Sequence, residues 1–402
     1  MKITPYEKNA KKHPKKQIEQ VANSIKEFGM NQPIVVDKQG VIVVGHGRYE
    51  ACKSLGWSEE EILKYVKVVD LTEEQAKAYR LADNKLNESD WDMNLVVEEL
   101  KGLSNEMLEI TGFDKDLIIE PDEKDDEVPE TPEEPQSKIG DLYELGNHRV
   151  LCGDSTKIED VERLMDGKKC AVTFTSPPYN AGKSETLSGN THTTDNKYGE
   201  YNDNKTQEEW KQLVLDTLKL AMTISEYKIY NIQMLAGNKK QLLLMLAEYV
   251  DHIADIAVWN KGHSAPAMAK NVMNSSYEWI IFFSSKENAT RAINTGDFRG
   301  QMKNIFDIPP QRKNEFASVH AATMPVALPL EVLKYVTKRD DAVYDNFAGT
   351  GTTLIAAEKT GRICYGMELD PKYIDVIVER YVDYTGNNKI KKNGQEVIWQ
   401  KK

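Results

Sequence analysis

The chain has 402 residues, of which 40% are hydrophobic, so we expect two or three globular domains with ordinary cores. It contains no run of about 18 apolar residues that could span a membrane, and residues 1–6 lack the apolar core of a signal peptide. The net charge of -12 argues against a protein that coats DNA without sequence preference.

The first part of the chain, near residues 1–119, is predicted to be a small α/β unit with a helical extension. Apolar residues recur at helical spacing from Gln17 to Phe28, and Gly29 provides a stop signal. Apolar runs over 33–37 and 41–44 flank Lys38-Gln39-Gly40 and predict a hairpin. The pattern then predicts a Gly-rich turn over 45–49, helices over 50–55, 72–81, 94–103 and 104–110, and a strand over 65–69.

An acidic, proline-rich stretch over residues 120–137 follows. Between Glu120 and Glu134 it holds nine acids and one base, which leaves about -4 for the rest of the chain. With almost no apolar residue to bury, the stretch is predicted to be an unfolded linker. Because most of the negative charge lies there, a basic groove elsewhere is allowed, and net charge does not exclude a nucleic-acid substrate.

In the second part, apolar runs alternate with helical patterns. This alternation predicts an α/β fold with a mostly parallel, doubly wound sheet that binds ligands at the carboxyl ends of its strands. Strands are expected over 149–152, 171–175, 227–232, 254–259, 279–283, 342–344 and 363–367, and helices over 208–221, 239–249, 329–336, 352–359 and 371–384. Residues 386–402 are expected to form a C-terminal tail.

The segment from Asp345 to Thr353 joins a predicted strand to a predicted helix and contains Gly349 and Gly351. Two glycines let the backbone approach a ligand closely, and a helix N-terminus favours a carboxylate or phosphate. A tight turn without a ligand is an equal alternative for this segment alone, and the absence of Gly-Lys-Ser/Thr disfavours a phosphate-cradling nucleotide loop. Glu368 ends the next strand, at a position where an acidic residue typically binds ribose hydroxyls. The glycine turn and Glu368 together favour ligand binding over a turn without a ligand.

The segment Thr175-Ser176-Pro177-Pro178-Tyr179-Asn180 follows another apolar strand. The two prolines fix φ and remove two N–H donors, so the carbonyls of Ser176 and Pro177 can face a ligand. The tyrosine that follows suits stacking on a planar ring. By itself the segment also fits a rigid loop with a core tyrosine.

Residues 138–385 resemble the DNA amino-methyltransferases, which methylate adenine N6 or cytosine N4. The two signatures of that family, (Asp/Asn/Ser)-Pro-Pro-(Tyr/Phe/Trp) and Phe-x-Gly-x-Gly, correspond to Ser176–Tyr179 and Phe347–Gly351, and their order resembles the permuted β class. Residues 140–155 resemble the family's entry segment, whose Gly-Asp pair contacts the cofactor adenine. His320–Pro325 resembles its His-Pro-x-x-x-Pro segment, with Ala321 in place of the first proline.

This resemblance implies a Rossmann-like, permuted methyltransferase sheet that uses S-adenosyl-L-methionine and needs no metal. It implies a catalytic loop made of Ser176, Pro177, Pro178 and Tyr179. It implies cofactor contacts from Asp154, Thr175, His320, Asp345, Phe347, Ala348, Gly349, Thr350, Gly351, Thr352 and Glu368.

The target amino group would be a weak nucleophile hidden in the base stack, so the base must be flipped out. Hydrogen bonds to Ser176 and the Pro177 carbonyl would favour a pyramidal nitrogen, Tyr179 would stack on the ring, and positioning would be the main catalytic effect. In the family a serine at the first loop position is more common among cytosine-N4 enzymes, so Ser176 tilts the prediction to cytosine N4. Asn180 and the general layout also occur in adenine-N6 enzymes.

Residues 181–314 are expected to hold a target-recognition insert for double-stranded DNA, with a loop over 184–204 that DNA could order. Arg299, Arg312 and Lys313 are candidates for phosphate or guanine contacts, and a solvated face is an equal alternative for each.

The first part of the chain resembles the ParB-like (ParB/sulfiredoxin) domain. The residues that carry the resemblance are Gly45-His46-Gly47-Arg48, with Pro33–Val36 before them and Leu81–Leu86 after them. In related domains the Gly-x-x-Arg turn touches nucleotide phosphates, and a glycine turn with an arginine suits a phosphate. A hairpin exit with a surface arginine is the alternative, and a role in DNA docking or regulation is equally open.

Three alternatives remain at this stage: methylation of RNA, methylation of a protein glutamine, and a catalytically silent DNA-binding or regulatory module. The motif order and the ParB-like part favour DNA. The four scattered cysteines form no Cys-x-x-Cys pair or Cys/His cluster, which predicts a reduced cytoplasmic protein. The resemblance implies a protein of a bacterium or of a phage in a bacterial host. A homodimer is left open.

Overall fold

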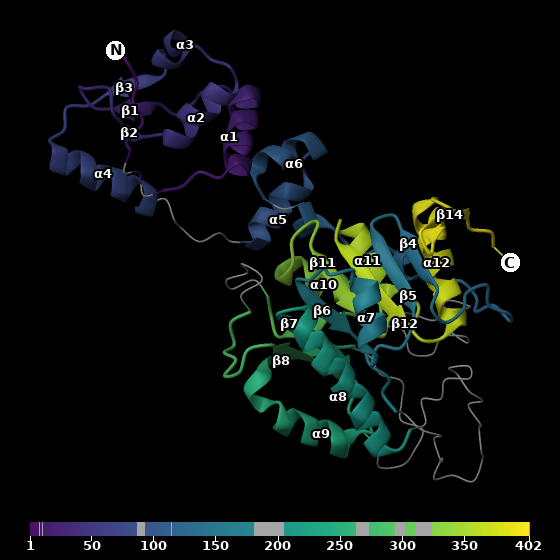
Figure 1. Ribbon diagram of the computed structural model, residues 1–402. Coiled ribbons are helices and arrows are strands. Elements are labelled where there is room, and N and C mark those ends of the chain that lie inside the picture. The colour runs from purple at the N-terminus through teal and green to yellow at the C-terminus, as the bar shows by residue number, and fades with distance from the viewer. Residues whose placement is uncertain are drawn as a thin grey trace. The chain divides into compact units, whose positions relative to one another are not determined.

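The computed structural model describes residues 1–7, 9, 11–86, 93–113, 115–180, 205–262, 273–293, 302–310 and 324–401. Its internal contacts divide the chain into two compact units, Met1–Ile119 and Glu120–Lys402 (Figure 1). Each unit has its own sheet and is described separately.

The first unit is built on a small sheet with the strand order β2-β1-β3. β1 (Ile34–Val36) pairs antiparallel with β2 (Ile42–Val44), as the predicted hairpin requires, and parallel with β3 (Val66–Val68). The helices are α1 (Lys15–Phe28), α2 (His46–Ser54), α3 (Glu59–Leu63), α4 (Glu73–Leu86), α5 (Met93–Lys101) and α6 (Asn105–Thr111), followed by the 3-10 turn η1 (Lys115–Ile118). The inner face of α1 packs on the sheet through an apolar cluster that includes Ile25, Ile34 and Ile42.

The glycine-rich segment after β2 differs from the sequence prediction. Residues 45–49 were expected to form a turn before a helix that begins at Glu50, but α2 already begins at His46. Gly45 is the residue before the first helical turn and has a φ of 98°, a left-handed conformation that favours glycine. This conformation lets the chain pass directly from β2 into α2, so His46, Gly47 and Arg48 form the helix N-terminus.

The second unit contains one mixed sheet of 11 strands among the described residues, in the order β10-β8-β9-β7-β6-β11-β12-β5-β4-β13-β14. Its strands are β4 (Leu142–Leu145), β5 (His148–Cys152), β6 (Val172–Thr175), β7 (Tyr227–Ile232), β8 (Ile253–Asn260), β9 (Tyr277–Ser284), β10 (Ile305–Asp307), β11 (Ala342–Asp345), β12 (Ile363–Glu368), β13 (Lys389–Lys392) and β14 (Gln395–Ile398). The five central strands, β7-β6-β11-β12-β5, are parallel, which confirms the predicted α/β fold. β8 and β9, and β4, β13 and β14, add antiparallel pairs on either side.

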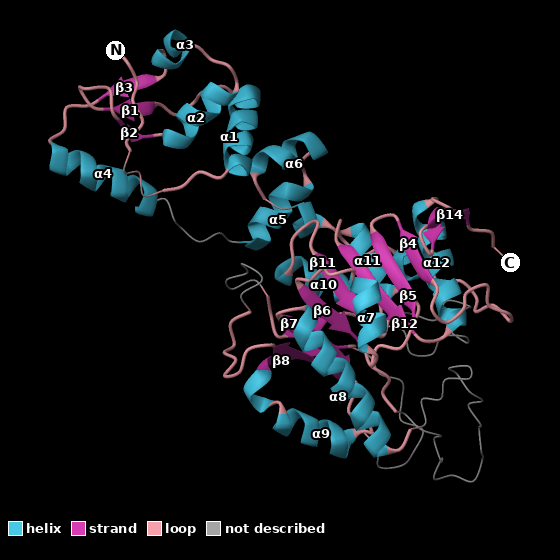
Figure 2. Cartoon of the chain, viewed as in Figure 1, coloured by secondary structure: helices cyan, strands magenta, loops and turns pink. Residues whose placement is uncertain are grey.

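Helices pack against this sheet (Figure 2). They are α7 (Ile158–Met165), α8 (Gln207–Ile224), α9 (Lys239–Glu248), α10 (Ala327–Val336), α11 (Thr352–Lys359) and α12 (Pro371–Thr385), with 3-10 turns η2 (Glu123–Asp126) and η3 (Val250–His252). Apolar side chains of α8 and α9 form a cluster with those of β7 and β9, including the fully buried Trp210 and Tyr230. Those of α7 form another with β5 and β12, including Leu151 and Met367. These clusters hold the strand ends in place.

The acidic segment is not a free linker, which corrects the prediction for residues 120–137. It belongs to the second unit, and the Asp125 side chain is buried. The Asp125 carboxylate binds Lys359 Nζ at 2.8 Å, and its carbonyl accepts a hydrogen bond from Arg380 Nη2 at 2.8 Å. Asp126 Oδ1 accepts from the Val326 backbone N–H at 2.8 Å. Composition missed this packing because the partners that stabilise the acids lie far away in the sequence.

The predicted C-terminal tail is also structured. β13 and β14 form an antiparallel hairpin, and β13 extends the sheet by pairing with β4. Asn393, at a φ of 52°, and Gly394 form its turn, a dipeptide that strongly favours a two-residue hairpin. Asp141 binds Lys392 at 2.7 Å and Asn393 at 2.9 Å, which ties the hairpin to the segment before β4.

The region over 181–314 is not one inserted subdomain. Its described residues include α8, α9 and β7 to β10, which belong to the main sheet and its helices. The patterns over 227–232, 254–259 and 279–283 are strands, as expected, so they and the sheet helices between them are not an insert.

Three further observations concern the described part of the chain. None of its helices is both long and apolar enough to cross a membrane. Its four cysteines are free and buried. Within the same residues, no group of three or more His, Cys, Asp or Glu side chains is arranged to hold a metal ion.

Candidate active site at the carboxyl ends of the parallel strands

The residues singled out in the second unit follow four neighbouring strand ends. β6 ends at Thr175, β11 at Asp345 and β12 at Glu368, and Asp154 lies two residues beyond β5. These strands are adjacent and parallel, so their carboxyl ends lie at one edge of the sheet. The Gly153 N–H donates to the Glu368 carbonyl at 3.0 Å, which places Asp154 beside the end of β12.

Asp345 joins two of these strand ends. Its buried Oδ1 accepts a hydrogen bond from the Thr175 hydroxyl at 2.7 Å and from the Phe347 N–H at 3.1 Å. Burial raises the pKa of this carboxyl, and the hydrogen bonds that it accepts oppose the shift. Gly349 and Gly351 follow at positive φ, 52° and 82°, and Gly351 is the N-cap residue just before α11. The predicted glycine turn is therefore connected directly to the end of β6.

Glu368 fixes the same turn from the β12 side. Its Oε2 accepts from the Gly349 N–H at 2.9 Å, and its Oε1 accepts from the N–H groups of Leu369 at 2.9 Å and Asp370 at 3.0 Å. Burial raises the pKa of Glu368 to about 7, although these hydrogen bonds favour the charged form. The residue as a whole is half-buried at the strand end.

Arg380 supports the glycine turn from behind. This buried side chain on α12 donates through Nη1 to the Thr350 carbonyl at 3.0 Å and to the Thr352 hydroxyl at 3.3 Å. Its Nη2 binds the Asp125 carbonyl, as described above. Burial lowers the pKa of Arg380 to about 10, so the guanidinium stays charged at neutral pH. The acidic segment and the glycine turn are thus joined by one guanidinium.

The loop after β6 is held by side chains from other elements. The Pro178 carbonyl accepts from the indole N–H of Trp210 at 2.6 Å. Asn180 has a φ of 52°, and its side chain forms hydrogen bonds in both directions with the backbone of Lys205, at 2.9 and 3.0 Å. The side chain of Asn238 donates to the Tyr179 carbonyl at 2.8 Å. The backbone from Pro178 to Asn180 is therefore fixed on both sides.

Gly237 lets another segment pass close to this loop. A Cβ atom at Gly237 would lie 2.1 Å from the Asn180 carbonyl oxygen, far inside van der Waals contact. The Asn180 side chain also donates to the Gly237 carbonyl at 3.2 Å. Only glycine fits without moving one of the two backbones.

The Tyr179 hydroxyl is bound by polar side chains. It lies 2.7 Å from Glu278 Oε2, 3.1 Å from Asn231 Oδ1 and 3.0 Å from Ser176 Oγ. The buried Glu278 also forms an ion pair with Lys261. The aromatic residue expected to stack on a planar ring is thus anchored through its hydroxyl.

The structure brings Asp154, Glu368, the glycine turn and the loop over 175–180 to one edge of the sheet. Several other candidates, namely His320, Arg299, Arg312, Lys313 and the loop over 184–204, lie outside the described residues. The roles of several residues that hold the two loops were not predicted: Trp210, Asn231, Gly237, Asn238, Lys261, Glu278 and Arg380. A signal for two of these was present, because Asn231 and Glu278 interrupt apolar strands, where polar side chains need partners.

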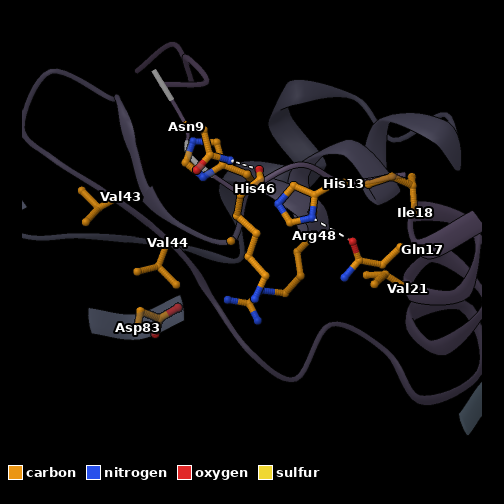
Figure 3. Close-up of a pocket in the computed structure, with 13 residues that line it drawn as sticks. Asn9, His13, Gln17, Ile18, Val21, Val43, Val44, His46, Arg48 and Asp83 are labelled. Carbon is orange, nitrogen blue, oxygen red and sulfur yellow. Dashed lines mark hydrogen bonds between the residues drawn. The ribbon is translucent and has the colours of Figure 1, made fainter. Parts of the chain in front are cut away.

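The first unit has a pocket of about 180 Å³ at the N-terminus of α2 (Figure 3). All four residues of the Gly45–Arg48 segment line it, together with Asn9, Lys11, His13, Gln17, Ile18, Val21, Val43, Val44 and Asp83. Arg48 donates through Nη1 to Gln32 Oε1 at 2.6 Å. His46 Nε2 accepts from the Tyr6 N–H at 3.2 Å, and burial, with smaller effects of Arg80 and His13, lowers the pKa of His46 to about 4.

Comparison with known proteins identifies the class of both units. Residues 170–379, more than half of the chain, match the N6/N4 methylase family, described as DNA methylase. The chain therefore belongs to the DNA methylase family. Residues 2–85 match the ParB N-terminal domain, so the first unit carries a domain of that kind.

Individual relatives cover parts of the chain. The type II methyltransferase M.Cfr9I of Citrobacter freundii is 28% identical over 149 residues, which are 36% of this chain and 50% of that protein. The ParB-like nuclease domain-containing protein YnaK of Escherichia coli K12 is 36% identical over 73 residues, 18% of this chain and 80% of that protein. The structure of the cytosine-N4-specific PvuII DNA methyltransferase is similar at a TM-score of 0.45 and 18% identity, covering 63% of this chain and 92% of that one. The chain spans half of M.Cfr9I and 29% of M.BglI of Bacillus subtilis.

The close approach at Gly237 yields a prediction. Gly237→Ala should lower the free energy of unfolding by about 1–3 kcal/mol, because the new methyl group must push the Asn180 backbone away. Urea unfolding followed by tryptophan fluorescence measures this, since Trp210 binds the same loop. Gly102→Ala is the matched control, because its Cβ would meet its nearest neighbour, the Glu99 carbonyl oxygen, at 3.5 Å. Equal midpoints for both variants would contradict the assigned constraint.

Proposed function

We propose that this chain transfers a methyl group from S-adenosyl-L-methionine to an exocyclic amino nitrogen of a base in double-stranded DNA. The observation that carries the proposal is the 2.7 Å hydrogen bond between Thr175 and Asp345. It fixes the Ser-Pro-Pro-Tyr loop beside the glycine turn, so a base bound by the first and a cofactor bound by the second would meet. Membership of the DNA methylase family supports the reaction class.

The residues at the strand ends fit this cofactor. S-adenosyl-L-methionine offers an ammonium group, two ribose hydroxyls and an adenine amino group, all of which donate hydrogen bonds. The site offers acceptors: Glu368, Asp154 and Asn346, whose buried Oδ1 has no hydrogen-bond partner among the described residues. The positive φ angles of Gly349 and Gly351 provide the backbone curvature for a close approach. The cofactor supplies an electrophilic methyl group when it is bound.

We assign the remaining cofactor contacts to the glycine turn and its surroundings. Glu368 would accept from ribose hydroxyls, and Asp154 would bind near the adenine. The other contacts that we propose are Thr175, His320, Asp345, Phe347, Ala348, Thr350 and Thr352. Arg380 acts on this set indirectly, by holding the carbonyl of Thr350.

The chain's own contribution to catalysis is positioning. An amino group conjugated with its ring is a poor nucleophile, and the base must leave the helix to be reached. Ser176 Oγ and the Pro177 carbonyl would accept the two amino hydrogens, and the Tyr179 ring would stack on the base. The rigid prolines and the hydrogen bonds around Tyr179 and Asn180 keep these groups in place before the substrate arrives.

We propose cytosine N4 as the target atom, with adenine N6 as the alternative. The support is Ser176, since serine at this loop position is the type more often found in cytosine-N4 enzymes. DNA contacts from Arg299, Arg312 and Lys313 remain part of the proposal.

The test uses S-adenosyl-L-methionine labelled in its methyl group, unmethylated DNA, and nucleoside analysis of the product. We expect label in N4-methylcytosine, and we expect Ser176→Ala and Tyr179→Ala to reduce the rate by about 100-fold or more, as loss of positioning does. Glu134→Ala, an exposed acid, serves as the control variant. Label in RNA or protein but not in DNA would refute the proposed substrate, and label at N6 of adenine would correct the target base.

The carboxyl of Glu368 predicts how cofactor affinity depends on pH. Its pKa is raised to about 7, so it is mostly protonated at pH 6 and mostly ionised at pH 8. If ribose hydroxyls donate to the ionised form, the dissociation constant for S-adenosyl-L-methionine should fall by up to about tenfold over this range. Calorimetry should also show that Glu368→Gln binds more weakly and has lost the dependence. Because the folded protein holds this proton more tightly than the unfolded chain does, Glu368 stabilises the fold at low pH. That contribution is lost as the pH rises from about 4.5 to about 7. A wild-type affinity independent of pH would contradict the role of Glu368.

We also propose a nucleotide phosphate site in the pocket of the first unit. The supporting observation is that Gly45–Arg48 form the N-terminus of α2 and line the pocket beside Lys11. Backbone N–H groups, the helix dipole and two cations favour a phosphate there. Arg48 Nε is buried without a hydrogen-bond partner among the described residues.

Binding of a fluorescent nucleoside triphosphate to the full chain tests this site. Arg48→Met should weaken binding by about tenfold or more, because a charge-assisted hydrogen bond to phosphate is lost. Lys38→Met is the control, since Lys38 pairs with Asp70 in the same unit and does not line the pocket. Equal binding by Arg48→Met and wild type, at equal melting temperatures, would exclude the phosphate role of Arg48.

A further inference from the structure

The Tyr179 hydroxyl lies at the centre of a polar network that the sequence motif does not contain. Ser176 belongs to the same loop, but Asn231 comes from β7 and Glu278 from β9. Asn231 is fully buried, and Glu278 is 5% exposed. Two residues 52 and 99 positions away from the tyrosine thus converge on one oxygen atom.

Lys261 is the charge partner of the acid in this network. It forms an ion pair with Oε1 of Glu278, while Oε2 faces the tyrosine. The Lys261 side chain is 17% exposed, and its ammonium lies 5.0 Å from the centre of the Trp259 ring. A buried carboxylate without a charge partner is costly. The ion pair through Oε1 supplies that partner and leaves Oε2 to accept from the tyrosine.

The chemistry of these groups sets the direction of each hydrogen bond. A phenol has one proton, and the carboxylate oxygen and the amide oxygen facing it both accept only. The Asn231 amide nitrogen faces the Trp279 carbonyl, at 3.4 Å, which turns its oxygen to the tyrosine. The Tyr179 proton is therefore used inside the network, most directly at the 2.7 Å contact with Glu278. Towards Ser176, Tyr179 must act as the acceptor, so the serine hydroxyl donates to it.

We propose that Glu278, paired with Lys261, is a positioning residue that acts through Tyr179 to fix the proton of Ser176. The serine proton then points at the tyrosine, and the remaining lone pairs of Oγ face the target amino group. A serine in this state accepts hydrogen bonds as an aspartate would, without adding a negative charge beside the base. The same contacts fix the plane of the Tyr179 ring on which the base stacks. This inference rests on the proposed function.

The network explains why a serine, which can donate or accept, is sufficient at the first loop position. A serine free to rotate would donate to a ring nitrogen or to water for part of the time, and its lone pairs would then be badly placed for the amino hydrogens. The series of contacts from Lys261 to Glu278, Tyr179 and Ser176 fixes the rotation of the serine hydroxyl before the base arrives.

Kinetics of Glu278→Gln, Tyr179→Phe and the double variant test the inference. Each single variant should lower kcat by about 10-fold or more, with KM for DNA and for S-adenosyl-L-methionine unchanged within about twofold, since the binding surfaces stay in place. The double variant should be no slower than Tyr179→Phe alone, because Glu278 acts only through the hydroxyl that this variant lacks. A purely structural role for Glu278 would instead add its loss to that of Tyr179→Phe.

Glu226→Gln is the matched control. Glu226 pairs with Lys286 at 2.7 Å and precedes β7, at the opposite end of the strand from Asn231, so its kcat should equal that of the wild type. Thermal melting accompanies every assay, and Tyr179→Phe carries the test by itself if Glu278→Gln does not fold.

The outcomes separate the two proposals. If the wild type transfers no methyl group to DNA, the proposed function fails and the inference falls with it. If the wild type is active and Tyr179→Phe or a folded Glu278→Gln keeps its kcat, or if the double variant shows additive losses, the inference alone is overturned.

Discussion

The hydrogen bond from the Thr175 hydroxyl to the buried Asp345 carboxylate links two segments that lie 170 residues apart. It requires β6 and β11 to be neighbours, and they are, in the middle of five parallel strands. The placement of the two loops beside each other follows from that adjacency. The Ser-Pro-Pro-Tyr loop leaves the sheet on one side of the bond, and the glycine turn leaves it on the other.

Around this bond the site is built from supports that are themselves buried and paired. Trp210, Asn238 and Gly237 constrain the loop, whereas Glu368 and Arg380 constrain the turn. A buried polar group is costly unless it is satisfied, so such networks favour one arrangement over its alternatives. The chemistry proposed for this chain needs little beyond accurate placement of a base and a cofactor, and rigidity of this kind provides it.

The local patterns predicted a large part of this arrangement. β7 and α11 have the predicted bounds. The strands that lead to Ser176, Asp345 and Glu368 were also predicted, because an apolar run or a glycine turn is visible in a short stretch of sequence. The supports were not predicted, since Glu278, Lys261 and Arg380 acquire their roles from partners brought close only by the sheet order. The C-terminal hairpin lies between these two cases. Asn393-Gly394 is a local signal for its turn, but no nearby residue indicates that β13 pairs with β4.

The acidic segment has a consequence for how such a protein can be divided. By composition the methylase part begins near residue 138, but by contacts it begins at Glu120, because Asp125 neutralises Lys359 and binds Arg380. A gene fusion or exchange that cut at the compositional border would leave the Lys359 ammonium without its carboxylate and Nη2 of the buried Arg380 without its carbonyl acceptor. The segment that looks like a spacer therefore has to be inherited with the catalytic part, and the true seam between the two modules lies at its other end.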